Sequence, residues 1–154
     1  MSKVEYVIQA LNDSKSVENI LSALPEWFGI ENAIYNYCED ASTMPTYFAV
    51  LGDGTKVGFV CMKFNNEFTA EIHVMGILKE YQGKGIGLAL VDYATEMARK
   101  RLSEYIMVKT VGSSSSDAHY AKTREFYTKA GFRPLAEFDS IWPGHPCLLM
   151  VKKI

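Results

Sequence analysis

The sequence predicts a mixed α/β fold: a sheet of six or seven strands, antiparallel in its N-terminal half, with about four helices. Two observations carry this prediction. Strand-like segments joined by a tight hairpin signal dominate the first half, and such neighbours pair antiparallel. Farther on, a strand, a glycine-rich turn, a helix and another strand form a unit whose crossover makes its strands parallel. The 154 residues suit one domain, 1–154, because single domains usually have about 100–200 residues.

Seven segments rich in β-branched and aromatic residues, bounded by turn formers, predict the strands. They cover 4–10, 47–51, 56–64, 70–78, 105–111, 135–141 and 147–152. Gly52-Asp53-Gly54-Thr55 separates the second from the third, and Asp and Gly tolerate the positive φ of a hairpin turn. Trp142-Pro143-Gly144-His145-Pro146 forms the turn between the last two.

Four segments space their apolar residues three and four apart, as one face of a helix does. They are 16–24, the part of 26–40 after Gly29, 88–102 and 118–130. Pro25 ends the first helix. Asp117 can cap the last helix at its N-terminus, and Gly131 supplies a left-handed stop at its end.

Composition excludes several classes of function. The formal net charge is -2, so the basic excess that binds nucleic acid phosphates is missing. No apolar run approaches the roughly 18 residues that a membrane span needs. The three cysteines, Cys38, Cys61 and Cys147, lie far apart without a Cys-x-x-Cys pair, which argues against a disulfide framework and a metal site. We therefore expect a cytoplasmic protein with no metal, no nucleic acid partner and no membrane partner.

The glycine-rich turn Gln82-Gly83-Lys84-Gly85-Ile86-Gly87 joins a predicted strand to a helix. Glycine lets the backbone approach a ligand, and the unpaired amides of a helix N-terminus attract phosphate. A P-loop is excluded because no Ser or Thr follows Lys84, and a dinucleotide fingerprint lacks its third glycine. A plain tight turn between strand and helix remains the alternative.

Two motifs together resemble the GNAT acetyltransferase superfamily. Gln82-x-x-Gly85-x-Gly87 is similar to its Gln/Arg-x-x-Gly-x-Gly/Ala signature. About 40 residues later, Phe126-Tyr127-Thr128-Lys129-Ala130-Gly131-Phe132 looks like the end of the late helix in that superfamily. The resemblance is clear over about 47–132, and the order of elements extends it to the whole chain.

The resemblance implies acetyl-CoA as co-substrate. In such proteins the turn amides bind the pyrophosphate, which here assigns Gln82, Gly83, Lys84, Gly85, Ile86 and Gly87. The strand before the turn is bulged, and its free backbone groups pair with the pantetheine arm, here at Gly76, Ile77 and Leu78. Glycine inside a strand often marks a bulge, which suits Gly76. Many relatives carry a coenzyme-contacting asparagine where this chain has Tyr120, beside His119, so either residue could replace that contact.

Acetyl transfer to an amine needs a group that removes a proton, because an ammonium has no lone pair. Glu71 occupies the position where several such enzymes place a glutamate, and His73 projects to the same face of the strand. Glu71 is the predicted base and His73 its partner. The alternatives are that Glu71 is a solvated carboxylate at the end of the strand and that His73 is a core histidine. A water chain is another route for the proton. Tyr127 is the predicted donor to the departing thiolate, against the alternative of a half-buried aromatic.

The predicted function is an N-acetyltransferase that moves the acetyl group to a primary amine of a small molecule by direct attack in a ternary complex. Trp27 and Trp142 are candidate acceptor contacts, because the N-terminal helices and the last loop line that pocket in relatives. His73 is a third candidate, since it shares a strand face with Glu71. His145 is expected to be exposed. The alternatives are a peptide or protein N-acetyltransferase and a non-catalytic acyl-CoA sensor. Many relatives dimerise, so a homodimer is compatible with the resemblance.

Overall fold

The computed structural model describes residues 3–29 and 31–154, and within them it contains seven strands and four α-helices. The strands are β1 Tyr6–Ala10, β2 Thr46–Leu51, β3 Lys56–Phe64, β4 Thr69–Ile77, β5 Tyr105–Val111, β6 Arg133–Trp142 and β7 His145–Lys153. The helices are α1 Ser14–Ser22, α2 Glu31–Ala41, α3 Ile86–Lys100 and α4 Ala118–Lys129, with a short 3-10 helix η1 at Lys79–Tyr81. Residue 30, within the segment 26–40, lies outside the described residues.

The strands form one mixed sheet, which confirms the predicted fold class. They are hydrogen-bonded in the order β1-β2-β3-β4-β5-β7-β6. β1 pairs antiparallel with β2, β2 with β3, β5 with β7 and β6 with β7, whereas β4 pairs parallel with β5. The antiparallel first half and the parallel crossover are thus both as predicted.

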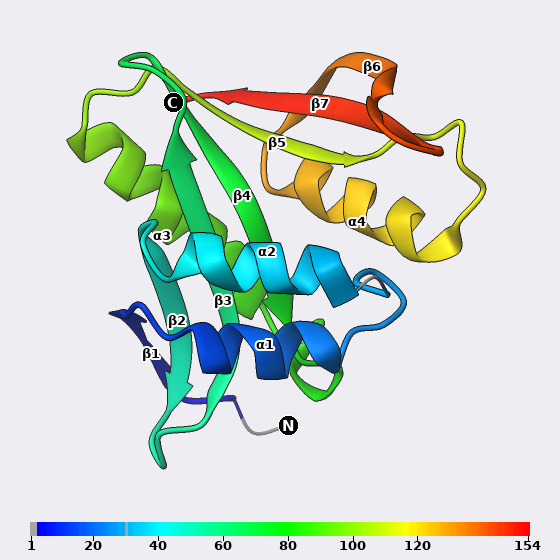
Figure 1. Cartoon of the computed structure of the whole chain (residues 1–154). Coiled ribbons are helices and arrows are strands. Elements are labelled where there is room, and N and C mark those ends of the chain that lie inside the picture. The colour runs from blue at the N-terminus through cyan, green and yellow to red at the C-terminus, as the bar shows by residue number, and fades with distance from the viewer. Residues whose placement is uncertain (1–2, 30) are drawn as a thin grey trace. The chain divides into compact units, whose positions relative to one another are not determined.

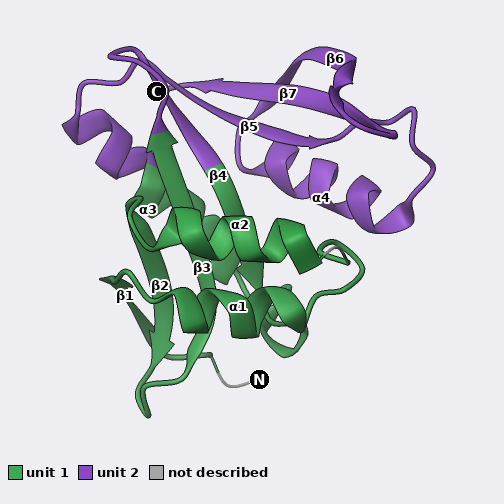
Figure 2. Ribbon diagram, viewed as in Figure 1, with its two compact units in different colours: residues 1–63, 73–94 green, residues 64–72, 95–154 purple. Residues whose placement is uncertain are grey.

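The chain divides into two compact units, coloured separately in Figure 2. Unit 1 comprises residues 1–63 and 73–94, and unit 2 comprises residues 64–72 and 95–154. The division crosses β4 and α3, so unit 1 holds the end of β4, the glycine-rich turn and the start of α3. Unit 2 holds the start of β4, the end of α3 and all later elements.

In unit 1, α1 and α2 lie side by side on one face of β2, β3 and the end of β4 (Figure 1). The core of this layer is apolar, with Ile20, Leu21 and Phe48 at most 1% exposed. The start of α3 covers the other face, where the Leu90 side chain approaches Gly58 of β3. Asp13 caps α1 by accepting a hydrogen bond from the Ser16 amide.

Gly76 near the end of β4 is required by the packing of α1. A Cβ at this position would lie 3.1 Å from Leu24, 3.3 Å from Ile20 and 3.4 Å from Leu21. All three side chains are buried and belong to the core beneath α1, so they have little room to move. The absence of a side chain at Gly76 therefore allows the helix to approach the strand.

Gly76→Val is expected to lower the free energy of unfolding by about 1–3 kcal/mol, because it forces extra methyl groups into a packed core. Urea denaturation followed by circular dichroism measures the change. Gly52→Ala in the β2–β3 turn is the control, since a Cβ there meets no described atom within 4 Å. It should change stability by less than about 0.5 kcal/mol. Equal stability of Gly76→Val and the wild type would contradict this packing.

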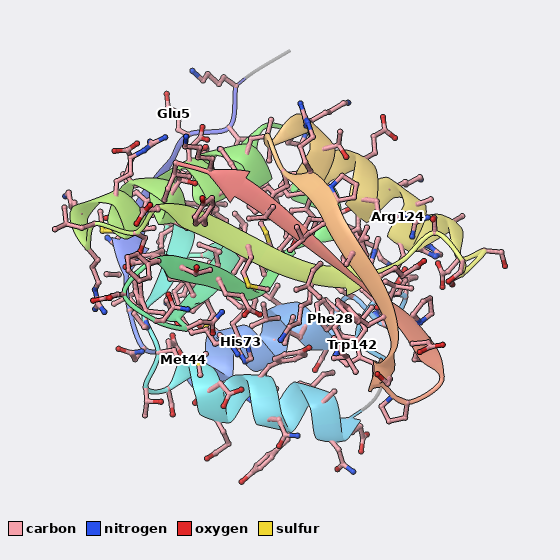
Figure 3. The ribbon with its side chains drawn as sticks, turned by 90° about the horizontal axis from the view of Figure 1, so that it is seen from above. Glu5, Phe28, Met44, His73, Arg124 and Trp142 are labelled. Carbon is pink, nitrogen blue, oxygen red and sulfur yellow. The ribbon has the colours of Figure 1, made fainter. Side chains whose placement is uncertain are left out.

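In unit 2, β5 lies between the start of β4 and β7, and α4 packs against it (Figures 1 and 2). Arg124 of α4, labelled in Figure 3, donates a hydrogen bond of 2.7 Å to the carbonyl of Val111 at the end of β5. Asp117 caps α4, and Gly131 follows it with a φ of 100°, which confirms both predicted ends of this helix. Among the described residues, no helix combines the length and the apolar character that crossing a bilayer requires.

Candidate functional site

The turn between β4 and α3 presents the N-terminus of α3 beside open space. Gly83 and Gly85 have φ values of 73° and 86°, a backbone region that favours glycine. The Gly85 carbonyl accepts the first helical hydrogen bond, from the Ala89 amide at 3.1 Å. The amides of Ile86, Gly87 and Leu88 therefore belong to the first turn, where a helix offers no internal acceptor. A Cβ at Gly83 or Gly85 would meet no described atom within 4 Å.

Gln82 links the turn back to the strand. Its Nε2 donates a hydrogen bond of 2.9 Å to the Ile77 carbonyl. The Lys84 side chain extends from an exposed position between the two glycines. The turn thus combines a helix N-terminus, a lysine and an unobstructed approach, which together suit a phosphate group.

The end of β4 uses its backbone groups differently from what the sequence predicts. The Leu78 amide donates to the Val57 carbonyl of β3 at 2.9 Å, so it is not a free donor. Successive residues of a strand direct their backbone groups to opposite edges, so Gly76 also faces β3. A Cβ placed on Gly58 of β3 would lie 3.3 Å from the Gly76 carbonyl oxygen, which agrees with a carbonyl that faces β3. Of the three predicted residues, Ile77 is the one whose backbone groups face away from β3.

His73 of β4 makes a contact that the sequence does not predict. Its Nε2 lies 2.7 Å from Oδ2 of Asp40, near the end of α2. The Tyr37 ring contacts the imidazole edge-on, with the ring centres 5.5 Å apart, and Phe28 contacts Tyr37 in the same manner at 6.0 Å. Figure 3 shows His73 and Phe28 beside α2. Asp40 is 33 residues away in sequence, so no local spacing could have revealed this pair.

The position of His73 shows that the alternation of β4 is interrupted. His73 contacts α2, while its neighbour Val74 belongs to the core beneath α1 and α2. Neighbouring residues of a regular strand face opposite sides, so two that face the same helices indicate a β-bulge. The interruption lies at His73–Val74, before Gly76, whose own lack of a side chain serves the packing of α1.

Glu71 is buried in unit 2 and not solvated, so the alternative of a solvated strand-end residue is wrong. The residue is 3% exposed. Its Oε1 accepts a hydrogen bond of 2.8 Å from Asn65, and its Oε2 lies 3.8 Å from Lys109 Nζ. Neither partner follows from the alternation of β4, because Asn65 lies in the preceding loop and Lys109 on β5.

Tyr127 is buried near the C-terminal end of α4. It is 6% exposed, and its ring lies edge-on to Phe126 at 5.2 Å and to Phe132 at 5.6 Å. The Phe132 amide donates to the Tyr127 carbonyl at 3.0 Å, which closes the helix end beyond Gly131. The two aromatic neighbours restrict the orientation of the Tyr127 ring.

The remaining candidates lie in both units. Trp27 of unit 1 is half-buried and packs against the core beneath α1. Trp142 of unit 2 ends β6, is half-buried and pairs with His145 across the β6–β7 turn. His145 is exposed, as predicted. His119 of α4 lies 3.4 Å from Asp117, and Tyr120 beside it is half-buried, so a coenzyme contact at either stays a prediction.

The three cysteines have the character of core residues. All are buried, and burial raises the pKa of Cys61 to about 11 and that of Cys38 and Cys147 above the ordinary value. A thiol with a raised pKa stays protonated at neutral pH, whereas the nucleophile is the thiolate. In the part of the chain that the structure describes, no cluster of His, Cys, Asp and Glu is arranged to hold a metal.

The chain matches the model of the acetyltransferase (GNAT) family over residues 9–132 and belongs to this family. The match covers both the glycine-rich turn and the end of the late helix. The family assigned from the two sequence motifs is thus confirmed.

The chain is similar to one curated relative and two solved structures that illustrate the range of the family. It is 32% identical over 85 residues to the mycothiol acetyltransferase of Beutenbergia cavernae, a match covering 55% of this chain and 27% of the relative. The fold resembles a GNAT-family protein from Desulfovibrio desulfuricans at a TM-score of 0.84 and 18% identity, over 97% of this chain and 99% of that chain. It also resembles the ribosomal-protein-S18-alanine N-acetyltransferase of Escherichia coli at a TM-score of 0.78 and 15% identity, over 97% and 94%.

Proposed function

We propose that residues 1–154 act as one catalytic domain that transfers the acetyl group of acetyl-CoA to a primary amine of a small molecule. The observation that carries this proposal is the turn at residues 82–87, with two glycines at positive φ beside the N-terminus of α3. Family membership supplies the donor, because the superfamily that the motifs resemble uses acetyl-CoA. The turn then holds the pyrophosphate, and Ile77, whose carbonyl accepts from Gln82, offers its backbone amide to the pantetheine arm.

The transfer proceeds by direct attack of the amine on the thioester carbonyl. The raised pKa values of the three cysteines support this route, because none of their thiols is a ready carrier of the acetyl group. Tyr127 gives a proton or a hydrogen bond to the departing thiolate. Glu71 assists the removal of the proton from the amine.

The acceptor is proposed to be a small molecule. The aromatic rings of Phe28 and Tyr37 beside His73 support an apolar wall for such a ligand, and a half-buried Trp27 extends the apolar surface of unit 1. A curated relative is named mycothiol acetyltransferase, although this chain spans about a quarter of its length. A peptide amine is the second candidate, since one structural neighbour is named for the alanine of a ribosomal protein.

A panel of acceptors with acetyl-CoA tests the proposal, with release of the coenzyme thiol as the readout. Small primary amines should release thiol faster than peptides with free N-termini of equal concentration. Faster release with the peptides would reverse the choice of acceptor. Binding of acetyl-CoA without thiol release in any reaction would favour the non-catalytic sensor.

Glu71→Gln is expected to lower turnover most near neutral pH and less as the pH rises. Glutamine keeps the acceptor for Asn65 and removes the negative charge with which Glu71 would assist the removal of the proton. An alkyl amine has a pKa near 10, roughly that of lysine, so free amine becomes abundant at high pH and needs less help. The pH profile of kcat measures this trend. The same fold-loss at every pH would assign Glu71 a role in packing instead.

A further inference from the structure

His73 and Asp40 form a pair with the geometry of a histidine held by a carboxylate. The carboxylate of Asp40 is an acceptor, so Nε2 of His73 carries the hydrogen and donates it across the 2.7 Å contact. In the neutral imidazole the other nitrogen, Nδ1, then carries a lone pair. Within the described part of the chain, no hydrogen bond occupies Nδ1. The His73 side chain is 17% exposed, so solvent reaches it.

The groups around His73 come from three elements. Helix α2 contributes an acidic group, Asp40, and an aromatic one, Tyr37. Burial raises the pKa of Tyr37, and the negative charge of Asp40 raises it further, so the hydroxyl group stays neutral. From β3, burial raises the pKa of Cys61 to about 11; the hydrogen bond with the Thr46 side chain lowers this pKa, and the charge of Asp40 raises it. Glu71 lies two residues before His73 on β4. In this set Asp40 is the carboxylate in hydrogen-bond contact with His73.

We propose that His73 accepts the proton of the acceptor ammonium at Nδ1, and that Asp40 is the positioning residue that fixes the tautomer. This inference rests on the proposed acetyl transfer and names the proton acceptor within it. The alternation of a regular strand pairs His73 with Glu71. The structure instead supplies Asp40, from a helix that no motif marks. The carboxylate also stabilises the imidazolium once the proton has arrived.

The ammonium R–NH3+ gives one proton to Nδ1, leaving R–NH2 and a His73 imidazolium paired with Asp40. The amine lone pair then forms the N–C bond to the thioester carbonyl, and collapse of the adduct breaks the C–S bond. The second proton leaves the nitrogen as the amide forms, the thiolate takes up a proton, and His73 returns its proton to solvent.

Exposure distinguishes His73 from Glu71 as the immediate acceptor. Glu71 is 3% exposed and already contacts Asn65 and Lys109. His73 has one nitrogen occupied and the other available, which is the arrangement that a base in contact with substrate needs. The side chain of Asp40 is 38% exposed, so solvent reaches the ion pair that it forms with the His73 imidazolium.

Two amines of similar size distinguish a role of His73 as a base from a role in binding or packing. At neutral pH ethylamine is an ammonium, whereas 2,2,2-trifluoroethylamine is already a free amine that needs no base. His73→Gln should lower kcat with ethylamine by about 10²-fold and leave the trifluoro compound nearly unaffected. Asp40→Asn should act in the same direction by a smaller factor. Glu39→Gln, which removes the neighbouring carboxylate of α2, is the control and should match the wild type with both amines.

A measurement independent of activity tests the pair itself. The 15N chemical shifts of the neutral His73 ring should show Nε2 protonated and Nδ1 unprotonated in the wild type, and a changed tautomer mixture in Asp40→Asn. An Nδ1–H tautomer in the wild type, or an unchanged ring in Asp40→Asn, would overturn the inference. So would an equal fold-loss of His73→Gln on both amines. If the wild type acetylates neither amine while the ring shifts are as expected, the proposed acceptor class fails and the oriented pair stands.

Discussion

Gly85→Asp is expected to abolish acetyl-CoA binding while leaving the fold intact. Gly85 has a φ of 86°, and a Cβ there meets no described atom within 4 Å. The new carboxylate therefore enters the space assigned to the pyrophosphate without a clash. Two unit charges about 4 Å apart near a protein surface repel by about 4 kcal/mol, or roughly 10³-fold in affinity. Isothermal titration calorimetry measures the affinity.

Gly85→Asn is the matched control for charge. Asparagine has nearly the shape of aspartate and tolerates positive φ, so it shares the backbone strain and the added bulk. Its affinity for acetyl-CoA should lie between those of the wild type and Gly85→Asp. Native circular dichroism in both variants excludes unfolding as the cause. Wild-type affinity in Gly85→Asp would place the coenzyme elsewhere.

Tyr127→Phe is expected to lower turnover by at least about 10²-fold, because general acid catalysis contributes about 10²–10⁴-fold. A thiol has a pKa near 8.5, so its thiolate leaves more readily when a proton or hydrogen bond is supplied. A phenol, with a pKa near 10, is protonated at neutral pH and can supply it. Phenylalanine keeps the ring between Phe126 and Phe132 and removes the hydroxyl alone.

Coenzyme affinity and folding should survive in Tyr127→Phe, which separates a chemical role from a structural one. Tyr105→Phe on β5 removes a phenol from a residue that is 41% exposed and is the control. The assay needs an acceptor for which the chemical step limits turnover. Wild-type kcat in Tyr127→Phe under that condition would refute the role.

Local signals predicted most of the fold. The bounds of β3 and β5 agree with the predicted 56–64 and 105–111, because apolar runs between turn formers mark both ends. β6 begins two residues before the predicted 135, at Arg133. Pro134 cannot donate to a ladder, but β6 lies at the end of the strand order, where proline is tolerated. The glycine-rich turn was located correctly, although α3 begins at Ile86 and not at 88.

The candidate site was less predictable, because its contacts join residues far apart in sequence. The motif predicted the position of Tyr127 and of the turn, which depend on local backbone geometry. The Asp40–His73 pair depends on how α2 packs on β4, and an interruption of the strand directs His73 to that helix. Regular alternation would have placed His73 and Val74 on opposite faces. A single sequence carries no signal for such a pairing.

We propose that the chain moves an acetyl group from coenzyme A directly to an amine. Acetyl-CoA labelled with 13C at both acetyl carbons tests it, with mass spectrometry of the acceptor and of the intact protein during turnover. We predict an acceptor product carrying both labelled carbons as an amide and an unmodified protein. Label found only as free acetate, or held as a stable acetyl group on the protein, would contradict direct transfer.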